Sequence, residues 1–504
     1  MWNKYDNFRR IRTLDGVVQL RLKVRRCATP ECERYGQAYR PEAEGKWALP
    51  QYEFGLDVIA FVGCLRYQEH RSVSQIHQVL ESRGLQVSER SVSYLLHRYD
   101  ELVSLQMGDA ERINKIMAGQ SQVILAIDGM QPDVGHEVLW VIREVLSGEI
   151  LLAKPLLSSS SNDLAPLLTQ VKQQLPVPIV ALMSDGQCSI RRAVANALPE
   201  VAHGLCHFHY LREAAKPIYE ADRHAKKELK KRVRGVRKLE RMVQQQPENP
   251  TNEVVEGYCQ AVRAALTDDG RPPLDAAGLT LHKRLSAIDD SLERPRSKGG
   301  VPKLLSQLKQ LLSTALTQTA ALWQPIAVAF DWVHQVATIL DNDEQLDGHH
   351  VRDRLEQLLQ RMEHDKVQAG SLSAGIEHFL KVTQSYAPGL FHCYDLAELP
   401  RTNNDLEQLF GSWRHHQRRC TGRKVAPASL VVRGAVQIVA AIATQTHSFT
   451  ADDLSSVSIS AWQSVRTELK NYQQQRNQQR NFRRSSDTYL ANLEQKFLQL
   501  SLPP

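Results

Sequence analysis

Several common stabilising and targeting features are missing from this sequence. The eight cysteines lie far apart along 504 residues and indicate no disulfide framework. The first residues, MWNKYDNFRRIRTL, have no apolar core, so we expect no signal peptide. The most apolar long stretch, Leu311 to Leu340, is interrupted by polar residues and by Asp331, and it predicts a buried amphipathic helix rather than a membrane span. We therefore expect a cytoplasmic protein with no membrane partner.

What is present is the composition of a globular protein, with 42% hydrophobic and 24% charged residues and a net charge of +7. A chain of this length exceeds one ordinary core, so we expect three or four structural units. Basic residues concentrate in two runs, Lys226 to Arg241 and Arg476 to Arg484. Such runs can follow a phosphate backbone, although a solvated helix face or a loose tail has the same composition.

Residues 1–48 are expected to form a small β-rich module, because GVVQLRLKVRRC alternates apolar and polar residues. Cys27 and Cys32 within this module could be half of a zinc ribbon. A closed zinc site needs four ligands, and the nearest other cysteine, Cys64, lies in an apolar helix-like run. The module therefore resembles the remnant of a zinc ribbon, and zinc binding by Cys27 and Cys32 stays undecided from the sequence.

Residues 49–117 are expected to be helical and to contain a helix-turn-helix motif in RSVSQIHQVLESRGLQVSERSVSYLLHRY. Each half has an apolar stripe at helical spacing, Gly84 breaks the first helix, and Ser88 is a good N-cap for the second. An ordinary helical hairpin has the same periodicity. If the motif binds DNA, the outward face of its second helix carries the expected contact residues Arg90, Ser93, Tyr94, His97 and Arg98.

Between residues 118 and 217 the pattern becomes that of an α/β domain. Apolar runs predict strands at 122–128, 137–145, 149–157, 178–185 and 201–205, and helices at 164–175, 189–198 and 206–216. A mixed sheet with helices on its faces is the natural closure. Residues 218–400 are helical in pattern, residues 401–450 contain two further helices, and residues 451–504 form a polar, basic helical tail.

Three carboxylates are the strongest candidates for catalysis. Asp128 and Asp185 each end an apolar strand and precede a glycine, so parallel neighbouring strands would bring both acids to one edge of the sheet. Glu407 lies on a predicted helix whose Leu406 and Phe410 would pack inward, which lets Glu407 project over that edge. Carboxylates are hard oxygen ligands suited to Mg²⁺. Two such ions ~3.5–4 Å apart, with Mn²⁺ as a substitute, would activate a water or a DNA 3′-hydroxyl for attack on phosphorus.

Alternatives for these acids exist within the same region. Asp-Gly at a strand end is commonly a turn, and Asp133, Glu137 and Glu144 are nearby carboxylates that compete for the role. The joint pattern is more specific, since the separations are 185 − 128 = 57 and 407 − 185 = 222 residues, with helices filling the second gap. The sequence contains no Walker phosphate loop, so no nucleotide cofactor is expected.

Three segments together resemble the DDE transposases of bacterial insertion sequences, with the Mutator-like group as the nearest kin: AIDGMQP, SDGQCSIRRAVANALPEVAHGLCHFH and TNNDLEQLFGSWRHH. The resemblance covers roughly residues 120–217 and 400–440 at the level of motifs. It implies that residues 118–217 and 401–450 form one ribonuclease H-like catalytic domain. The all-helical segment 218–400 would then be an insertion within that domain.

Transferred position by position, the resemblance makes Asp128, Asp185 and Glu407 the metal ligands. Arg414 lies seven residues after Glu407, where such enzymes often have a basic residue facing DNA phosphate. Helical spacing supports this placement independently, because seven residues along a helix return to the same face. Arg418 is expected to face DNA together with Arg414.

The resemblance also draws attention to two pairs of residues outside the acids. Cys206 and His209 form its Cys-x-x-His motif, whose spacing suits a zinc pair, but only His207 is nearby to help. A structural role, holding the helix onto the sheet, is the simpler interpretation. Trp323 and Trp332 lie in the insertion, where resembling families place a tryptophan that stacks on DNA bases; packing in the core is the alternative.

The sequence thus predicts a DNA transposase that cleaves the terminal inverted repeats of its own element and joins them to double-stranded target DNA. Two ends must be paired for this reaction, so we expect a homodimer or a higher homo-oligomer. In a bacterial cell it would be nucleoid-associated when bound to DNA. A domesticated DNA-binding regulator without transposition activity is the main alternative, and a structure-selective nuclease that cuts without joining is a third.

Overall fold

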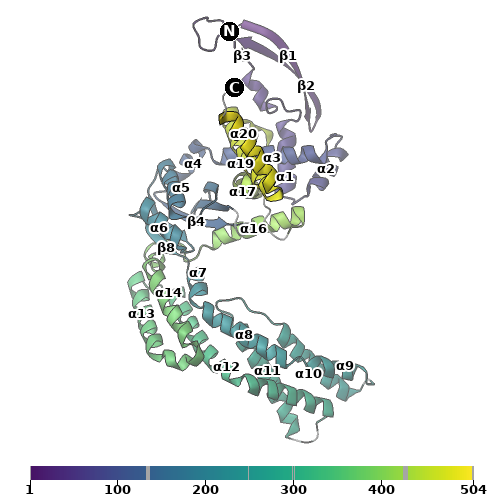
Figure 1. Cartoon of the computed structure of the whole chain (residues 1–504), viewed down its shortest axis with the longest axis vertical. Coiled ribbons are helices and arrows are strands. Elements are labelled where there is room, and N and C mark those ends of the chain that lie inside the picture. The colour runs from purple at the N-terminus through teal and green to yellow at the C-terminus, as the bar shows by residue number, and fades with distance from the viewer. Residues whose placement is uncertain are drawn as a thin grey trace. The chain divides into compact units, whose positions relative to one another are not determined.

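The computed structural model describes residues 2–131, 137–247, 249–297, 299, 301–423 and 430–501. Within these residues the protein is mixed α/β with helices predominating, and it contains one five-stranded and one three-stranded sheet (Figure 1). Among the described helices, none has the length and apolar character needed to span a membrane. The chain forms two compact units. Unit 1 is Met1–Val180, Ser189–Val201 and Asn404–Pro504, and unit 2 is Ala181–Cys188 and Ala202–Asn403.

Unit 1 begins with the small β module that the sequence predicted. Its antiparallel strands are β1 (Trp2–Thr13), β2 (Gly16–Arg26) and β3 (Ala38–Tyr39), in the order β1-β2-β3. Leu22 and Val24 of β2 are buried, whereas the residues on either side of them are exposed. The alternation in the sequence therefore follows the two faces of the strand.

The next part of unit 1 is helical. It comprises the 3-10 helix η1 (Glu42–Lys46) and the helices α1 (Leu56–Tyr67), α2 (Val73–Ser82), α3 (Glu89–Met107) and α4 (Ala110–Met117). Helices α2 and α3 have the predicted helix-turn-helix layout, with Leu80 and Val92 fully buried. The turn between them requires glycine, because Gly84 has a left-handed φ of +80°. Ser88 caps α3 by accepting a hydrogen bond from the Ser91 N–H at 3.1 Å.

The C-terminal helices of unit 1 pack against this helical region around a buried acid. They are α16 (Asn404–Thr421), α17 (Leu430–Thr446), α18 (Ala451–Ser455), α19 (Ile459–Arg484) and α20 (Ser486–Ser501). Glu101 of α3 is fully buried, and its Oε1 accepts from Arg98 at 2.8 Å and from Arg433 of α17 at 3.1 Å. Its Oε2 accepts from the indole N–H of Trp462, on α19, at 2.9 Å. We call these four residues the Glu101 cluster.

The five-stranded sheet has the order β6-β5-β4-β7-β8. Its strands are β4 (Val123–Met130), β5 (Val138–Glu144), β6 (Ile150–Leu156), β7 (Ile179–Ser184) and β8 (Ala202–Leu205). Strands β4, β5 and β6 pair antiparallel, with Asp128 opposite Val141, and β7 pairs parallel with β8. The N–H of Val123 donates to the carbonyl of Pro178 at 3.0 Å. Because both residues stand at the start of a strand, β4 and β7 run in the same direction.

Two helices, α5 (Ser161–Gln174) and α6 (Cys188–Ala197), lie between the strands in the chain, as predicted. The N-cap of α5 is Ser160, whose side chain accepts from the Asp163 N–H. Helix α5 packs against β6, and α17 packs against β5 and β6. Helices from distant parts of the sequence therefore cover the sheet.

Unit 2 is almost entirely helical. Its elements after β8 are α7 (His207–Ala214), α8 (Lys216–Arg232), α9 (Val236–Gln244), α10 (Pro250–Thr267), α11 (Ala277–Arg296), α12 (Lys303–Asp341), α13 (Gly348–Asp365), η2 (Lys366–Leu372), α14 (Ser373–Leu390) and α15 (His392–Asp395). The 39-residue helix α12 contains the apolar stretch predicted to be a buried helix, and it packs against α8 and α11 (Figure 1). One continuous apolar core runs through these helices.

The boundary of unit 2 differs from that of the predicted insertion. The sequence placed the insertion at 218–400, whereas unit 2 also includes β8 and α7. The reason is packing, because Tyr210 of α7 is fully buried and its hydroxyl lies 2.7 Å from Oγ1 of Thr383 on α14. Helix α7 therefore belongs to the helical core, although the sequence analysis assigned it to the α/β domain of residues 118–217.

Candidate functional site

Asp185 directly follows β7, and neighbouring residues of unit 2 fix its backbone. Its carbonyl accepts a hydrogen bond from the Tyr386 hydroxyl at 3.2 Å, and its Oδ1 accepts from the Gln187 N–H at 2.9 Å. Gly186 has a φ of +84°, and a Cβ atom there would lie 2.6 Å from the Tyr386 ring. The sharp turn therefore requires glycine. It leaves the Asp185 side chain half-exposed at the end of the strand.

The strand end before Asp185 is supported by the start of α7. Ser184 is fully buried, and its carbonyl accepts from the Cys206 N–H at 2.9 Å. The buried Cys206 thiol in turn accepts from the Asn403 N–H at 3.3 Å. His209 lies one turn further along α7 and is half-buried. These contacts favour the interpretation that Cys206 holds α7 to the sheet.

Asp128 and Glu407 lie on two elements of unit 1 that pack against each other, β4 and α16. Asp128 is half-exposed, and its Oδ1 accepts from the Gly129 N–H at 2.7 Å. Glu407 lies in the first turn of α16 and is also half-exposed, while Leu406 and Phe410 are buried as the spacing predicted. A carboxylate in the first turn of a helix is stabilised by the helix dipole. These two predicted metal ligands thus occupy neighbouring elements.

The competing carboxylates have other roles where the structure describes them. Glu144 is fully buried and accepts from the Ser147 hydroxyl at 2.7 Å, so it organises the turn between β5 and β6. Glu137 pairs with Arg476 at 3.2 Å. Asp133 lies outside the described residues. Glu144 is therefore committed to a turn, which leaves Asp128 as the acid best placed on this part of the sheet.

Three of the five expected DNA-contacting residues on α3 are accessible. Arg90 and Tyr94 are exposed one turn apart, and the Arg90 Nε donates to the Tyr94 hydroxyl at 3.0 Å. Ser93 is half-exposed, and its hydroxyl donates to the Glu89 carbonyl at 3.2 Å. This face offers a cation and hydroxyl groups to solvent, which suits contacts with phosphates or base edges.

Of the other two expected residues, His97 lies beside Tyr94, with the two rings edge-on at a centroid distance of 6.3 Å, whereas Arg98 is turned inward. Arg98 is 6% exposed; it donates to Glu101 at 2.8 Å and to the Tyr52 hydroxyl at 2.7 Å. His97 is half-buried, and burial, together with the charge of Arg433, lowers the pKa of His97 to about 3. The prediction that Arg98 faces outward is corrected here, because α17 and α19 cover that side of α3.

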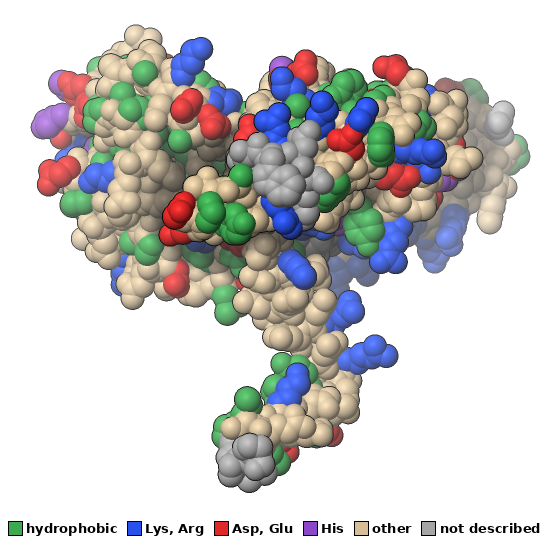
Figure 2. Space-filling model, turned by 90° about the horizontal axis from the view of Figure 1, so that it is seen from above, with side chains coloured by type: hydrophobic (Ala, Val, Ile, Leu, Met, Phe, Trp, Pro, Cys, Tyr) green, Lys and Arg blue, Asp and Glu red, His purple; other side chains and the backbone are tan. Residues whose placement is uncertain are grey.

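Further basic side chains lie on α16 and in unit 2. Arg414 and Arg418 of α16 are both exposed and lie one turn apart. The first basic run falls on α8 and α9, where Lys230, Arg234 and Arg237 line a cavity of about 550 Å³. Figure 2 shows basic and acidic side chains intermixed in the upper part of the view and basic ones more frequent in the lower part. Each of these surfaces offers the positive charge that binding to a phosphate backbone requires.

The two tryptophans singled out in the insertion are core residues of unit 2. Trp323 is 4% exposed, its indole N–H donates to Thr319 Oγ1 at 3.1 Å, and its ring stacks on His282 at a centroid distance of 4.7 Å. Trp332 is 8% exposed. Because protein atoms surround these side chains, the arrangement favours packing over stacking on DNA bases.

Cys27 and Cys32 lie in the loop between β2 and β3. A hydrogen bond from the backbone of Thr29, with the Cys32 thiol as a further partner, lowers the pKa of Cys27. Among the residues that the structure describes, no third His, Cys or acidic ligand joins this pair within ligand distance. Two ligands do not close a zinc site.

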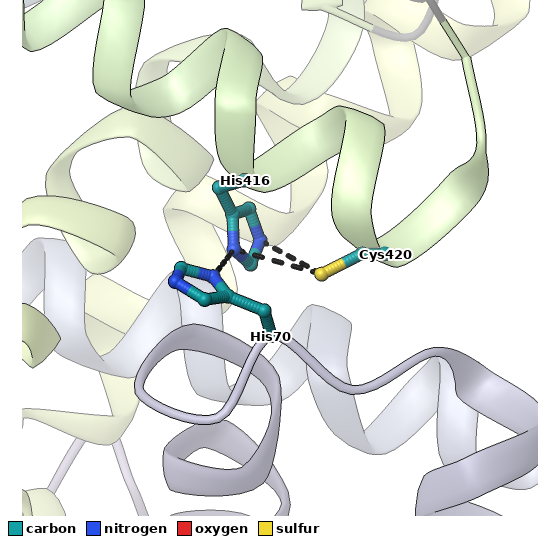
Figure 3. Close-up of side chains that lie close together, drawn as sticks. All are labelled: His70, His416 and Cys420. Carbon is teal, nitrogen blue, oxygen red and sulfur yellow. Dashed lines mark hydrogen bonds between the residues drawn. The ribbon is translucent and has the colours of Figure 1, made fainter.

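Three residues that the sequence analysis did not single out come together in unit 1. They are His70, from the turn between α1 and α2, and His416 and Cys420 of α16 (Figure 3). Their candidate ligand atoms all lie within 4.8 Å of one another. The only local signal is the four-residue spacing of His416 and Cys420, which puts both on one helix face. His70 lies 346 residues before His416 in the chain, so no local pattern links it to them.

Comparison with known proteins identifies no relative: no family model matches the chain, and no curated protein matches it. The class of protein therefore has to follow from the residues themselves. Asp128, Asp185 and Glu407 supply hard oxygen donors of the kind that bind Mg²⁺. The histidine and cysteine group supplies softer nitrogen and sulfur donors. The chain thus carries two chemically different groups of candidate metal ligands.

Proposed function

We propose that this protein is a DDE-type DNA transposase in which Asp128, Asp185 and Glu407 are the metal ligands. The supporting observation is positional. Asp128 lies in β4, Asp185 directly follows β7, which is next to β4 in the strand order, and Glu407 begins the helix that packs on β4. The resemblance of the three motif segments to DDE transposases supports the same assignment. A ribonuclease H-like domain interrupted by the helices of unit 2 is part of this proposal.

The donor set fits Mg²⁺, with Mn²⁺ as a substitute, because all three side chains are half-exposed carboxylates. When bound, a pair of such ions activates a water or a DNA 3′-hydroxyl and stabilises the leaving oxygen of a phosphodiester. The chain's own contribution is to position the ligands. The Tyr386 hydroxyl holds the backbone of Asp185 at the strand end. The first turn of α16 holds Glu407 beside β4.

The substrate of this proposed activity is double-stranded DNA. The helix-turn-helix would bind the terminal inverted repeats of the mobile element through Arg90 and Tyr94, which are exposed on α3. Arg414 and Arg418 on α16 would contact phosphates close to Glu407 on the same helix. Pairing of two DNA ends requires at least two active sites, which a homodimer or higher homo-oligomer provides.

The decisive experiment is a Mg²⁺-dependent cleavage and joining assay on DNA that carries the flanks of the encoding locus. We expect wild type to nick at the repeat boundary and to join the end to target DNA. Asp185→Asn and Glu407→Gln should lose nicking to below detection while they still bind the DNA. Asp405→Asn is the matched control, because this exposed acid lies two residues before Glu407 on the same helix and should remain active.

Each other outcome points to a different function. Nicking that persists in Asp185→Asn would refute the assignment of the metal ligands. Specific DNA binding without nicking, in Mg²⁺ and in Mn²⁺, would identify a domesticated DNA-binding regulator. Cleavage without joining would identify a structure-selective nuclease.

A further inference from the structure

A group of nitrogen and sulfur donors lies in unit 1, separate from the proposed catalytic acids in both position and chemistry. His70 Nδ1 lies 2.9 Å from His416 Nδ1, and the Cys420 Sγ lies 3.6 Å from both ring nitrogens of His416 (Figure 3). His416 and Cys420 are one turn apart on α16, so the helix itself sets their spacing. His70 reaches them from the turn after α1.

These distances are close to those between the ligands of a tetrahedral zinc ion. With Zn–N bonds of about 2.0–2.1 Å and Zn–S bonds of about 2.3 Å, tetrahedral geometry separates nitrogen from sulfur by about 3.5 Å and nitrogen from nitrogen by about 3.4 Å. The Cys420 Sγ lies 3.6 Å from His416 Nδ1, which agrees with this value, but it is equally far from Nε2, so the His416 ring would have to turn to direct Nδ1 at a shared ion. The nitrogen–nitrogen distance of 2.9 Å would have to lengthen by a few tenths of an ångström.

The backbone of His70 supplies an independent indication that this side chain has a role. His70 has a φ of +54°, in the left-handed region. That conformation costs a residue with a Cβ atom roughly 1–2 kcal/mol, and glycine would adopt it freely. Residues held in such conformations cluster at functional sites. Here the turn aims an imidazole at a buried histidine and a buried cysteine.

The surroundings suit a soft metal ion rather than a hard one. His416 and Cys420 are only 1% and 5% exposed. Two imidazoles and a thiolate form a donor set typical of zinc rather than of Mg²⁺.

We propose that His70, His416 and Cys420 bind one zinc ion, with the fourth position left to water or to His415. The His415 ring stands edge-on to that of His70 at a centroid distance of 5.9 Å, and it is the neighbouring residue on α16. The ion cross-links the turn before the helix-turn-helix to the helix that carries Glu407. Glu407 and His416 are nine residues apart, or about 13.5 Å along the helix axis. The zinc ion thus has a structural role and fixes α16 to the DNA-binding region within unit 1.

The first test is the metal content of the full-length protein. We expect about one zinc ion per chain in wild type after purification from zinc-containing medium, and its loss in His70→Gly and Cys420→Ser. His70→Gly is the sharper variant, because glycine suits the left-handed backbone and removes only the ligand. Cys259→Ser is a matched control, since this buried thiol lies in unit 2. The double change Cys27→Ser and Cys32→Ser separates zinc at the N-terminal cysteines from zinc at this cluster; both controls should keep the ion.

Affinity and spectroscopy keep the test decisive even if one variant folds poorly. Against a competing chelator, His70→Gly should bind zinc at least roughly 100-fold more weakly than wild type, since loss of a ligand exceeds the effect of loss of a supporting residue. Reconstitution with Co²⁺ should give a thiolate-to-metal charge-transfer band in wild type and in both controls, but not in Cys420→Ser. Circular dichroism reports whether each variant is folded.

The proposal is overturned if reconstituted wild type holds no zinc or if both ligand variants retain it at the wild-type affinity. A Co²⁺ spectrum without a thiolate band would overturn it as well, and would leave the short distance between His70 and His416 as a plain hydrogen bond. All of these measurements are made without DNA. They are therefore independent of whether the protein proves to be a transposase.

Discussion

The two units differ in the partners of their buried acids. In unit 1 a fully buried acid, Glu101, binds Arg98, Arg433 and the indole of Trp462. In unit 2 the apolar cluster is dominated by leucine and valine, and the buried acid Asp222 accepts from the backbone N–H groups of Gly278 and Leu279. Unit 1 is assembled from three separate stretches of chain, whereas nearly all of unit 2 is the continuous stretch 202–403.

This difference reflects how the segments of each unit are brought together. Apolar contacts are non-directional, and they suffice where consecutive helices fold back on one another. Unit 1 has to bring α17 and α19 onto α3 from more than 300 residues away in the sequence. A buried ion pair contributes little net stability compared with apolar packing, but it penalises any arrangement that leaves the charge unpaired. We infer that the Glu101 cluster fixes how the distant segments of unit 1 align.

The largest expected effect in this comparison comes from Glu101→Gln. The change leaves the buried Arg98 and the half-buried Arg433 without their counter-charge, so unit 1 should lose about 3–5 kcal/mol of stability. Hydrogen exchange measured on peptides from α3 and α17 should show this loss, with little change in α11 and α12. Equal loss of protection in both units would contradict the separation of their cores.

The converse experiment is Leu312→Ala in α12 of unit 2. Leu312 is fully buried in the apolar cluster, and its truncation leaves a cavity that should cost about 2–5 kcal/mol. Faster hydrogen exchange should be confined to unit 2, and peptides from α3 should be unaffected. If α3 responds as strongly as α12, the two interiors are energetically coupled.

A smaller effect is expected from pH, through His97 of unit 1. Burial, with the charges of Arg433 and Arg98, lowers the pKa of His97 from 6.5 to about 3. The neutral ring therefore contributes stability above pH 6.5 that is lost as the pH falls from 6.5 towards 3. Between pH 7 and pH 5 wild type should lose about 1–2 kcal/mol more than His97→Gln.

Asp100 has to be considered in the same pH range. Burial raises the pKa of Asp100 to about 6, so its protonation on acidification acts in the opposite direction. This contribution is common to wild type and His97→Gln, and the difference between the two urea-unfolding curves therefore isolates the histidine. Identical pH dependence in the two proteins would mean that His97 is solvated in the folded state.

The smallest effect should come from an ion pair on the surface of unit 2. Glu344 and Arg354 form a two-pronged salt bridge at 2.7 and 2.8 Å, but both side chains are exposed. Solvent screening leaves such pairs with little net stability. Glu344→Gln should therefore leave the unfolding midpoint of unit 2 unchanged, in contrast to Glu101→Gln in unit 1. A measurable drop would show that unit 2 also depends on charge pairing.

Local sequence patterns predicted the elements well and the contacts between them poorly. Some features depend only on residues a few positions apart, so the sequence alone reveals them. They are the alternation in β2, the apolar runs of β4 and β7, the helix break at Gly84 and the N-cap at Ser88. Asp185 directly follows β7 as predicted, but the prediction that Asp128 ends its strand is wrong, because pairing with β5 continues β4 to Met130. Arg98 was misplaced because its outward-looking helical position is covered by α17 and α19. No spacing rule in the α3 sequence indicates that cover.

The metal-ligand group shows the same limit. His416 and Cys420 are visible as an i, i+4 pair on a helix, but their third partner, His70, comes from a turn hundreds of residues earlier. Its left-handed backbone cannot be read from the sequence either, because residues 68–71 contain no glycine to mark it. Long-range contact and backbone conformation are the two properties that only the structure supplies.

The two ends of the helical segment of unit 2 lie in contact, which has a consequence for how freely the length of that segment can vary. The N–H of His207, at the start of α7, donates to the carbonyl of Arg401 at 3.0 Å. The first and the last residues of the helical segment are therefore held together by a backbone hydrogen bond. The residues between these two points are packed helices, so the separation of the two ends is set by the contact itself and not by the number of helices between them. Whole helices could be added or removed far from the contact between His207 and Arg401 without moving the strand that positions Asp185.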